Sequence, residues 1–191
     1  MTSRRILAVG AVAMLLAFAA GWAVFRAPRW STGASTKAVA ANAPIKPAPP
    51  GRKIKARLFY VTDDGLRLTG VEREIAYGES AVDQAREIVA AQIAPVAEPL
   101  VSAVPAGTAL RALFITDRGE AFVDLSREVV SAHPGGSVNE LLTVYTFVNA
   151  LTANLPAIQS VQLLVDGKEV DTLSGHVDLR RPLAKNLAWV Q

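Results

Sequence analysis

The chain has 191 residues, enough for one ordinary domain and an appendage, and its formal net charge at pH 7 is +3. Residues 1–51 contain six basic residues and no acidic one, whereas residues 52–191 contain 14 basic and 17 acidic residues. This mildly acidic part lacks the basic surface that a phosphate backbone needs, so we expect no nucleic-acid partner. The chain has no cysteine, which excludes disulfides, thiolate nucleophiles and a lipid-modified N-terminal cysteine.

Residues 1–26 are predicted to be an N-terminal transmembrane anchor. Residues 6–25 contain no charge and no proline over 20 positions, enough to cross a bilayer as a helix rising about 1.5 Å per residue. Two arginines precede this span and favour a cytoplasmic N-terminus. The alternative is a cleaved signal peptide, but its apolar part is usually about 7 to 15 residues long. We therefore expect a single-pass inner (plasma) membrane protein whose C-terminal domain lies outside the cytoplasm.

Residues 27–51 are predicted to be a flexible tether, because they are rich in proline and alanine and have few large apolar side chains. The folded domain is predicted over residues 52–185, with a short C-terminal tail at 186–191.

The first half of the domain is predicted to form a hairpin and a helix. Residues 54–62 and 66–76 have strand character and flank an Asp-Asp-Gly turn. Ser80 begins a helix, with Asp83 completing an approximate capping box, and prolines at 95 and 99 end it. Its expected apolar stripe consists of Val82, Ala85, Val89 and Ile93.

The second half is predicted to contain two hairpins around a long helix. The hairpins are residues 109–116 with 120–125, and 161–165 with 168–173. Residues 126–132 have the pattern of one or two helical turns. The long helix runs from Ser137 to about Leu155, with Ser137 and Glu140 as a capping box. Its apolar arc is wide, which indicates that it is covered on more than one side.

The two histidines are weak candidates for catalysis. Ser131 is close to His133 and Asp178 to His176 in the sequence, so a Ser-His-Asp triad can be drawn, but no nucleophile elbow accompanies it. We expect His133 to cap a turn and His176 to make a local hydrogen bond. His176 and Asp178 are too few ligands for zinc, and no phosphate-binding loop is present. We therefore predict no catalytic residues, no metal and no cofactor.

Two polar residues, Asn149 and Thr152, fall on the apolar stripe of the long helix. A buried amide without a partner costs about 1–3 kcal/mol, so we expect internal partners, with Asn149 holding an adjoining loop.

Seven segments in order resemble the GerMN domain, which occurs in the sporulation and germination protein GerM and in other bacterial envelope proteins. They are RLFY at 57–60, SAVPAGT at 102–108, FVDLS at 122–126, GSVNE at 136–140, VNALT at 148–152, VQLLVDG at 161–167 and LSGHVDL at 173–179. The residues singled out within these segments, as structural or interaction positions, are Pro105, Gly107, Thr108, Asp124, Ser126, Gly136, Ser137, Glu140, Asn149, Thr152, Gly167, Gly175, His176 and Asp178.

The resemblance implies an α+β domain, with a small mixed or antiparallel sheet against two main helices, similar to ring-building modules of transenvelope complexes. It implies no enzymatic activity and a place outside the cytoplasmic membrane. Unlike the sporulation proteins, this chain has one copy of the domain and no lipobox cysteine. We expect a membrane-tethered binding or assembly module whose partners are envelope proteins or further copies of itself. The alternatives are a module that binds peptidoglycan or assists a cell-wall enzyme, and a hydrolase using His176 and Asp178.

Overall fold

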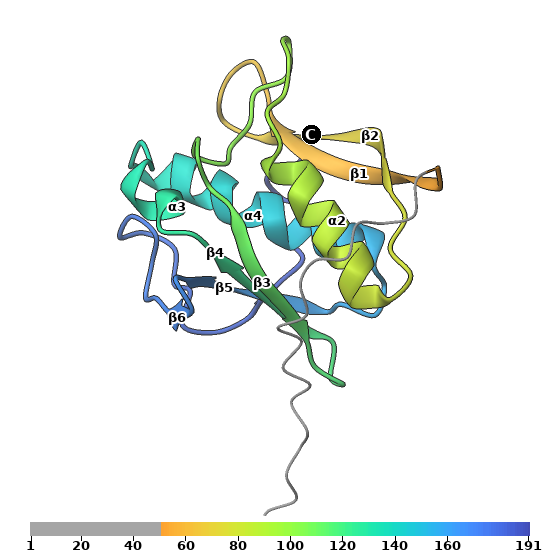
Figure 1. The fold of residues 1–191 in the computed structure, drawn as a ribbon. Helices are drawn as coiled ribbons and strands as arrows, with labels where there is room; N and C mark the ends of the chain where they lie inside the picture. The colour runs from red at the N-terminus through yellow and green to blue at the C-terminus, as the bar shows by residue number, and fades with distance from the viewer. Residues whose placement is uncertain (1–50) are drawn as a thin grey trace, which may run out of the picture. The chain divides into compact units, whose positions relative to one another are not determined.

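The computed structural model describes residues 51–191, which form two β-sheets with two long helices between them (Figure 1). The α+β class predicted from the sequence is confirmed, but the strands form two separate sheets where we predicted one. No helix within residues 51–191 is long and apolar enough to cross a membrane. The predicted anchor, including the span at residues 6–25, lies outside the described residues.

The first sheet is an antiparallel hairpin of β1 (Lys53–Val61) and β2 (Leu68–Ala76), as predicted. Leu58, Phe59 and Tyr60 are consecutive and all fully buried. Since successive side chains point to opposite faces of a strand, both faces of the sheet are covered at this end of β1.

Helix α2 (Ala81–Ile93) begins where the sequence predicts it. The Ser80 hydroxyl accepts a hydrogen bond from the Asp83 backbone nitrogen at 3.1 Å. Its buried face differs from the predicted stripe, because Ile88 and two glutamines, Gln84 and Gln92, are buried there. The predicted outer members of the stripe are only partly buried.

The second sheet has the order β3 (Leu110–Ile115), β4 (Glu120–Leu125), β5 (Ser160–Val165), β6 (Lys168–Glu169), with β7 (Leu183–Ala184) also pairing with β5. Strands β4 and β5 are parallel. A parallel pair needs a long crossover, and here α3 (Glu128–Ser131) and α4 (Ser137–Asn154) supply it. Strand β6 is much shorter than predicted, because the chain leaves the sheet after Glu169.

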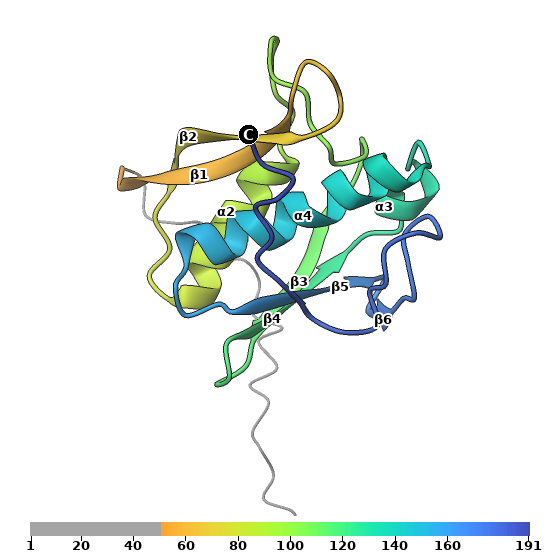
Figure 2. The same cartoon turned by 180° about the vertical axis from the view of Figure 1, so that it is seen from behind.

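Helices α2 and α4 contact each other and strands of both sheets, so the main core lies around them. Helix α4 is buried over a wide arc, as predicted. The residues predicted to be a tail lie against the domain: Leu68 donates its backbone N–H to Trp189 at 2.7 Å, and Gln191 donates to Leu68 at 2.8 Å. Viewed from behind, the C-terminal segment accordingly reaches β2 (Figure 2).

Candidate functional site

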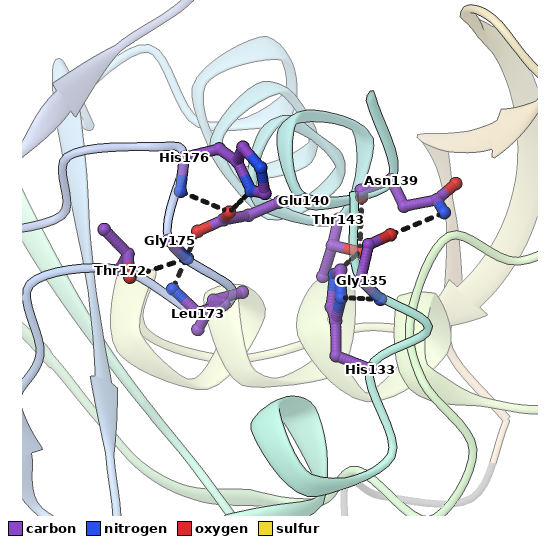
Figure 3. A network of polar contacts seen from close by, with 9 residues as sticks. All are labelled: His133, Gly135, Asn139, Glu140, Thr143, Thr172, Leu173, Gly175 and His176. Atoms are coloured by element: carbon purple, nitrogen blue, oxygen red, sulfur yellow. Dashed lines mark hydrogen bonds and ion pairs between the residues drawn. The ribbon is translucent and has the colours of Figure 1, made fainter. Parts of the chain in front are cut away.

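Three loops meet around the N-terminal half of α4, and three of the family-like sequence segments lie there. The loops are residues 102–108, 133–136 and 172–178, and the last two are drawn in Figure 3. The Thr143 hydroxyl, on α4, donates to the Ala103 carbonyl at 2.7 Å and lies 3.3 Å from His133 Nε2. Glu140, one turn earlier on the helix, binds the third loop. We call this arrangement the α4 loop cluster.

Glu140 is the central residue of the α4 loop cluster and is fully buried. One carboxylate oxygen accepts from the Leu173 backbone nitrogen at 2.8 Å. The other accepts from the His176 backbone nitrogen at 2.8 Å and lies 3.1 Å from His176 Nδ1. Burial raises the pKa of Glu140, but backbone N–H groups of the loop lower it by more, so the net shift is downward. Glu140 is therefore a buried anion whose charge is balanced by loop dipoles.

The predicted capping box at the start of α4 is wrong. The N-cap is Gly136, which has a positive φ of 87°, and Ser137 is the first helical residue. Glu140 therefore lies one position beyond the place that a capping box requires, and its side chain bonds to the third loop instead. Glu140 also accepts from the Leu173 backbone nitrogen, which the strand predicted over 168–173 would have placed in the sheet.

His133 caps a turn, as predicted, because its Nδ1 accepts from the Gly135 backbone nitrogen at 2.9 Å. Burial lowers the pKa of His133, so the neutral ring is favoured. With Nδ1 accepting, the neutral ring carries its proton on Nε2 and presents a donor to the Thr143 oxygen. His133 in this tautomer cannot accept the Thr143 proton, so the pair is not a base with its nucleophile.

His176 does not make the local bond predicted for it, since its Nδ1 faces Glu140 on a different element. Asp178 is instead paired with Arg180, through bonds of 2.7 Å and 2.9 Å. The drawn Ser-His-Asp triad is thus not assembled. The His176 side chain is 44% exposed, which places it at the surface of the cluster. Gly175 lies in the same loop, where its N–H donates to the Thr172 hydroxyl at 2.9 Å.

Other family-like residues hold neighbouring loops. Asp124 is buried and accepts from the Gly167 backbone nitrogen at 2.7 Å, fixing the β5–β6 turn. The Ser126 hydroxyl accepts from the Ala109 nitrogen at 3.0 Å. Thr108 closes the turn that contains Gly107 by donating its hydroxyl to the Pro105 carbonyl at 2.7 Å. These side chains shape backbone turns.

Asn149 and Thr152 lie farther along α4. Asn149 is fully buried, donates to the Asn186 carbonyl at 2.8 Å and accepts from the Asn186 nitrogen at 3.0 Å. The loop contact predicted for Asn149 is therefore present. Thr152 bonds back to the Val148 carbonyl of its own helix at 2.7 Å.

Three side-chain amides that were not predicted from the sequence hold the β1–β2 hairpin. Gln92 bonds to both backbone groups of Phe59. Asn154 does the same for Arg57, at 2.8 Å for each bond. Gln84 accepts from the Gly78 nitrogen at 2.9 Å. The available signal was the placement of two glutamines among the apolar residues of α2, where a polar side chain needs a partner.

Besides the α4 loop cluster, the described residues form an open groove but no metal-binding cluster. One open groove of about 420 Å³ lies between α3 and β6, lined by Arg127, Val130, Ser131, Val165, Asp166, Lys168, Glu169 and Val170. In residues 51–191 no group of three or more histidine, cysteine, aspartate or glutamate side chains is placed to hold a metal ion. The α4 loop cluster instead positions loops and presents their surfaces.

Fold and loop cluster together define an α+β domain of the GerMN type. The model of the family Germane, described as sporulation and spore germination, matches residues 57–171. The match covers more than half of the chain, and the protein belongs to this family.

Solved structures similar to the chain include two that cover 70% of it. The tandem GerMN domains of the sporulation protein GerM from Bacillus subtilis are 19% identical, with a TM-score of 0.55. That match covers 70% of this chain and 46% of the GerM chain. A candidate lipoprotein from Clostridium perfringens is 25% identical, with a TM-score of 0.50 over 70% of this chain and 88% of the other. A comparison with curated protein sequences gave no match.

Proposed function

We propose that this protein is a non-enzymatic binding and assembly module of the bacterial cell envelope. It is held at the cytoplasmic membrane by residues 6–25 and carried outside the cytoplasm on the tether of residues 27–51. Family membership supports the envelope assignment, as does the similarity to a candidate lipoprotein. The apolar, uncharged run at residues 6–25 supports the membrane attachment.

The binding role rests mainly on one observation, that acidic side chains of the domain are buried and bonded to loop backbone instead of facing a cleft. Glu140 and Asp124 are ionisable or polar groups of the kind that enzymes expose in clefts, yet both are buried and bonded to loop backbone. Such groups give a rigid loop surface, which suits recognition of a partner. The partners we propose are envelope proteins, or further copies of this chain.

Topology and partner capture test this proposal in cells. A reporter active only outside the cytoplasm, fused after Gln191, should be active, because the N-terminus is expected to be cytoplasmic. Crosslinking in cells followed by mass spectrometry should recover envelope proteins or crosslinked copies of the chain. A silent reporter would overturn the orientation.

Two biochemical assays distinguish the proposal from its alternatives. Co-sedimentation of the protein with purified peptidoglycan, without protein crosslinks in cells, would instead show that its partner is the cell-wall polymer. Turnover of ester or peptide substrates that disappears in His176→Ala would contradict a non-enzymatic role. We expect no such turnover, because Asp178 is paired with Arg180 and does not orient His176.

A further inference from the structure

The two edges of the β1–β2 hairpin are treated differently by the rest of the domain. On the outer edge of β1, Gln92 pairs with Phe59 and Asn154 with Arg57. The next outward nitrogen, that of Val61, donates to the Val101 carbonyl at 2.8 Å. From residue 57 to residue 61 this edge is therefore closed to any further strand.

The outer edge of β2 is closed only at its ends. At one end, Leu68 is paired with the C-terminal segment. At the other, the Ala76 carbonyl accepts from the Gln84 side chain at 3.3 Å. Between them the edge is open.

The register identifies the open positions. Phe59 points its backbone groups away from β2, so its partner Gly70 is in a non-hydrogen-bonded pair and points its own groups outward. The same holds for Glu72 and Glu74, opposite Arg57 and Lys55. In the part of the chain that the structure describes, no hydrogen bond reaches the outward N–H or carbonyl groups of Gly70, Glu72 and Glu74.

The side chains beside this edge form rows of opposite charge. Lys53 pairs with Glu74 at 3.6 Å and Lys55 with Glu72 at 3.8 Å, and all four side chains are at least 65% exposed. A basic row on β1 is thus followed by an acidic row on β2. Opposite charges on adjacent strands stabilise a sheet, so a third strand would best present basic side chains.

At Gly70 the surface beside the edge is basic instead. A Cβ added at this position would clash with the Arg57 guanidinium group, so the Arg57 side chain lies across Gly70. Arg57 also lies over the Phe59 ring, 5.7 Å from its centroid. The sheet surface next to the open edge therefore has no bulky group from β2 at residue 70.

A second copy of the chain fits this edge poorly. Pairing β2 with β2 of another copy would place Glu72 and Glu74 beside the same acidic residues, and like charges on neighbouring strands are destabilising. Pairing with the outer edge of β1 is limited to residues 53–55, because Asn154 closes that edge at Arg57.

We propose that the open edge of β2, from Gly70 to Glu74, binds an extended segment of a partner protein that has basic side chains at alternate positions. The segment adds to the sheet as a strand, with backbone hydrogen bonds giving affinity and the acidic row selecting the sequence. This inference rests on the proposed binding function and names the surface used.

The probe is a synthetic peptide of alternating lysine and threonine, with an alternating glutamate and threonine peptide as its charge control. A third peptide has the lysine sequence with N-methyl groups on alternate residues, which removes the backbone donors that would face β2. Fluorescence anisotropy with the full-length protein in detergent measures binding at two salt concentrations. We expect the lysine peptide to bind, more weakly at high salt, and both controls to bind at least about tenfold more weakly.

The protein variants test the location. Glu72→Lys with Glu74→Lys should weaken lysine-peptide binding at least about tenfold. Glu98→Lys with Glu169→Lys makes the same change in net charge at exposed residues elsewhere and should leave binding unchanged. Circular dichroism checks that both variants fold, and the N-methylated peptide tests the wild-type protein if the edge variant does not fold.

The inference would be overturned by no binding of the lysine peptide, by equal binding of the N-methylated peptide, or by equal loss in both double variants. A dimer that disappears in the edge variant, seen by sedimentation, would give the edge to a second copy and also overturn it. If crosslinks to envelope proteins persist in the edge variant, the proposed binding function still holds, but the β2 edge is not the surface that it uses.

Discussion

The side-chain amide of Gln92 pairs with both backbone groups of Phe59, donating to its carbonyl at 2.8 Å and accepting from its nitrogen at 2.9 Å. Both residues are fully buried, so water cannot replace either bond. We predict that Gln92→Met lowers the free energy of unfolding by about 2 kcal/mol or more. Asn154→Leu should cost about 1 kcal/mol, since the Arg57 backbone is solvent-accessible. Urea unfolding measures both free-energy losses. Equal losses would contradict the claim that the buried Gln92–Phe59 pair contributes more than the exposed Asn154–Arg57 pair.

The fragment of residues 52–191 is the sample for such measurements, and we predict that it folds alone. About 140 residues can bury a sufficient core, and the described core cluster lies entirely within this range. The amide region of its ¹H–¹⁵N NMR spectrum should be widely dispersed. Narrow dispersion would show that the domain needs residues 1–51.

Replacing Glu140 should loosen the third loop of the cluster. Glu140→Gln keeps the shape but presents an amide to two backbone donors, so we predict a loss of about 1–3 kcal/mol at pH 7. Amide exchange should quicken most at residues 173–177. A matched control is Glu98→Gln, at an exposed carboxylate between α2 and β3, which should change stability by less than about 0.5 kcal/mol.

The Glu140 effect should depend on pH in a defined direction. Its pKa is lowered in the folded protein from an ordinary value of 4.5. The stability that it contributes is therefore present above pH 4.5 and is lost as pH falls through the lowered folded value. The difference in unfolding free energy between wild type and Glu140→Gln should shrink as the pH falls below about 4.5. A difference that grows as the pH falls below 4.5 would contradict an anionic Glu140.

Two threonines one turn apart on α4 should respond oppositely to valine. The Thr146 hydroxyl is buried and is the only such side-chain atom without a partner in residues 51–191. Thr146→Val should therefore stabilise the domain by about 1 kcal/mol, because it removes the desolvated hydroxyl at similar volume and helix propensity. Thr143→Val should destabilise it, since the Ala103 carbonyl loses its donor. Thermal melting of the two variants measures this, and melting temperatures that shift in the same direction would contradict the prediction.

Asn149 anchors the segment before the C-terminus, so its loss should have a structural signature. We predict that Asn149→Leu costs about 1–3 kcal/mol, because the Asn186 backbone loses both its partners. Thr152→Val should cost less, since its one bond lies within the helix. An unchanged urea midpoint for Asn149→Leu, together with the loss of a crosslinked partner in cells, would instead assign Asn149 to a binding surface.

Local signals predicted most of the strands and helices but not how they assemble. Ser80 with Asp83 predicted the start of α2, and the strand-like segments at 109–116 and 120–125 predicted the β3–β4 hairpin, because these signals act over a few residues. The role of Glu140 could not be predicted in the same way, since its partners lie more than 30 positions away and are backbone groups without a sequence signature. The division of the strands into two sheets could not be predicted either. The side chains that occupy the outer edge of β1, and so keep other strands from pairing with it, come from helices α2 and α4.

The bonds from Gln92 and Asn154 to β1 also bear on how the domain comes apart. No strand of one sheet pairs with a strand of the other, so the hairpin is joined to the domain largely through α2 and α4. Releasing the hairpin would break buried hydrogen bonds and expose the faces of the two helices that pack in the shared core. Local unfolding of the hairpin alone should therefore be costly in free energy, and the domain should melt in a single cooperative transition.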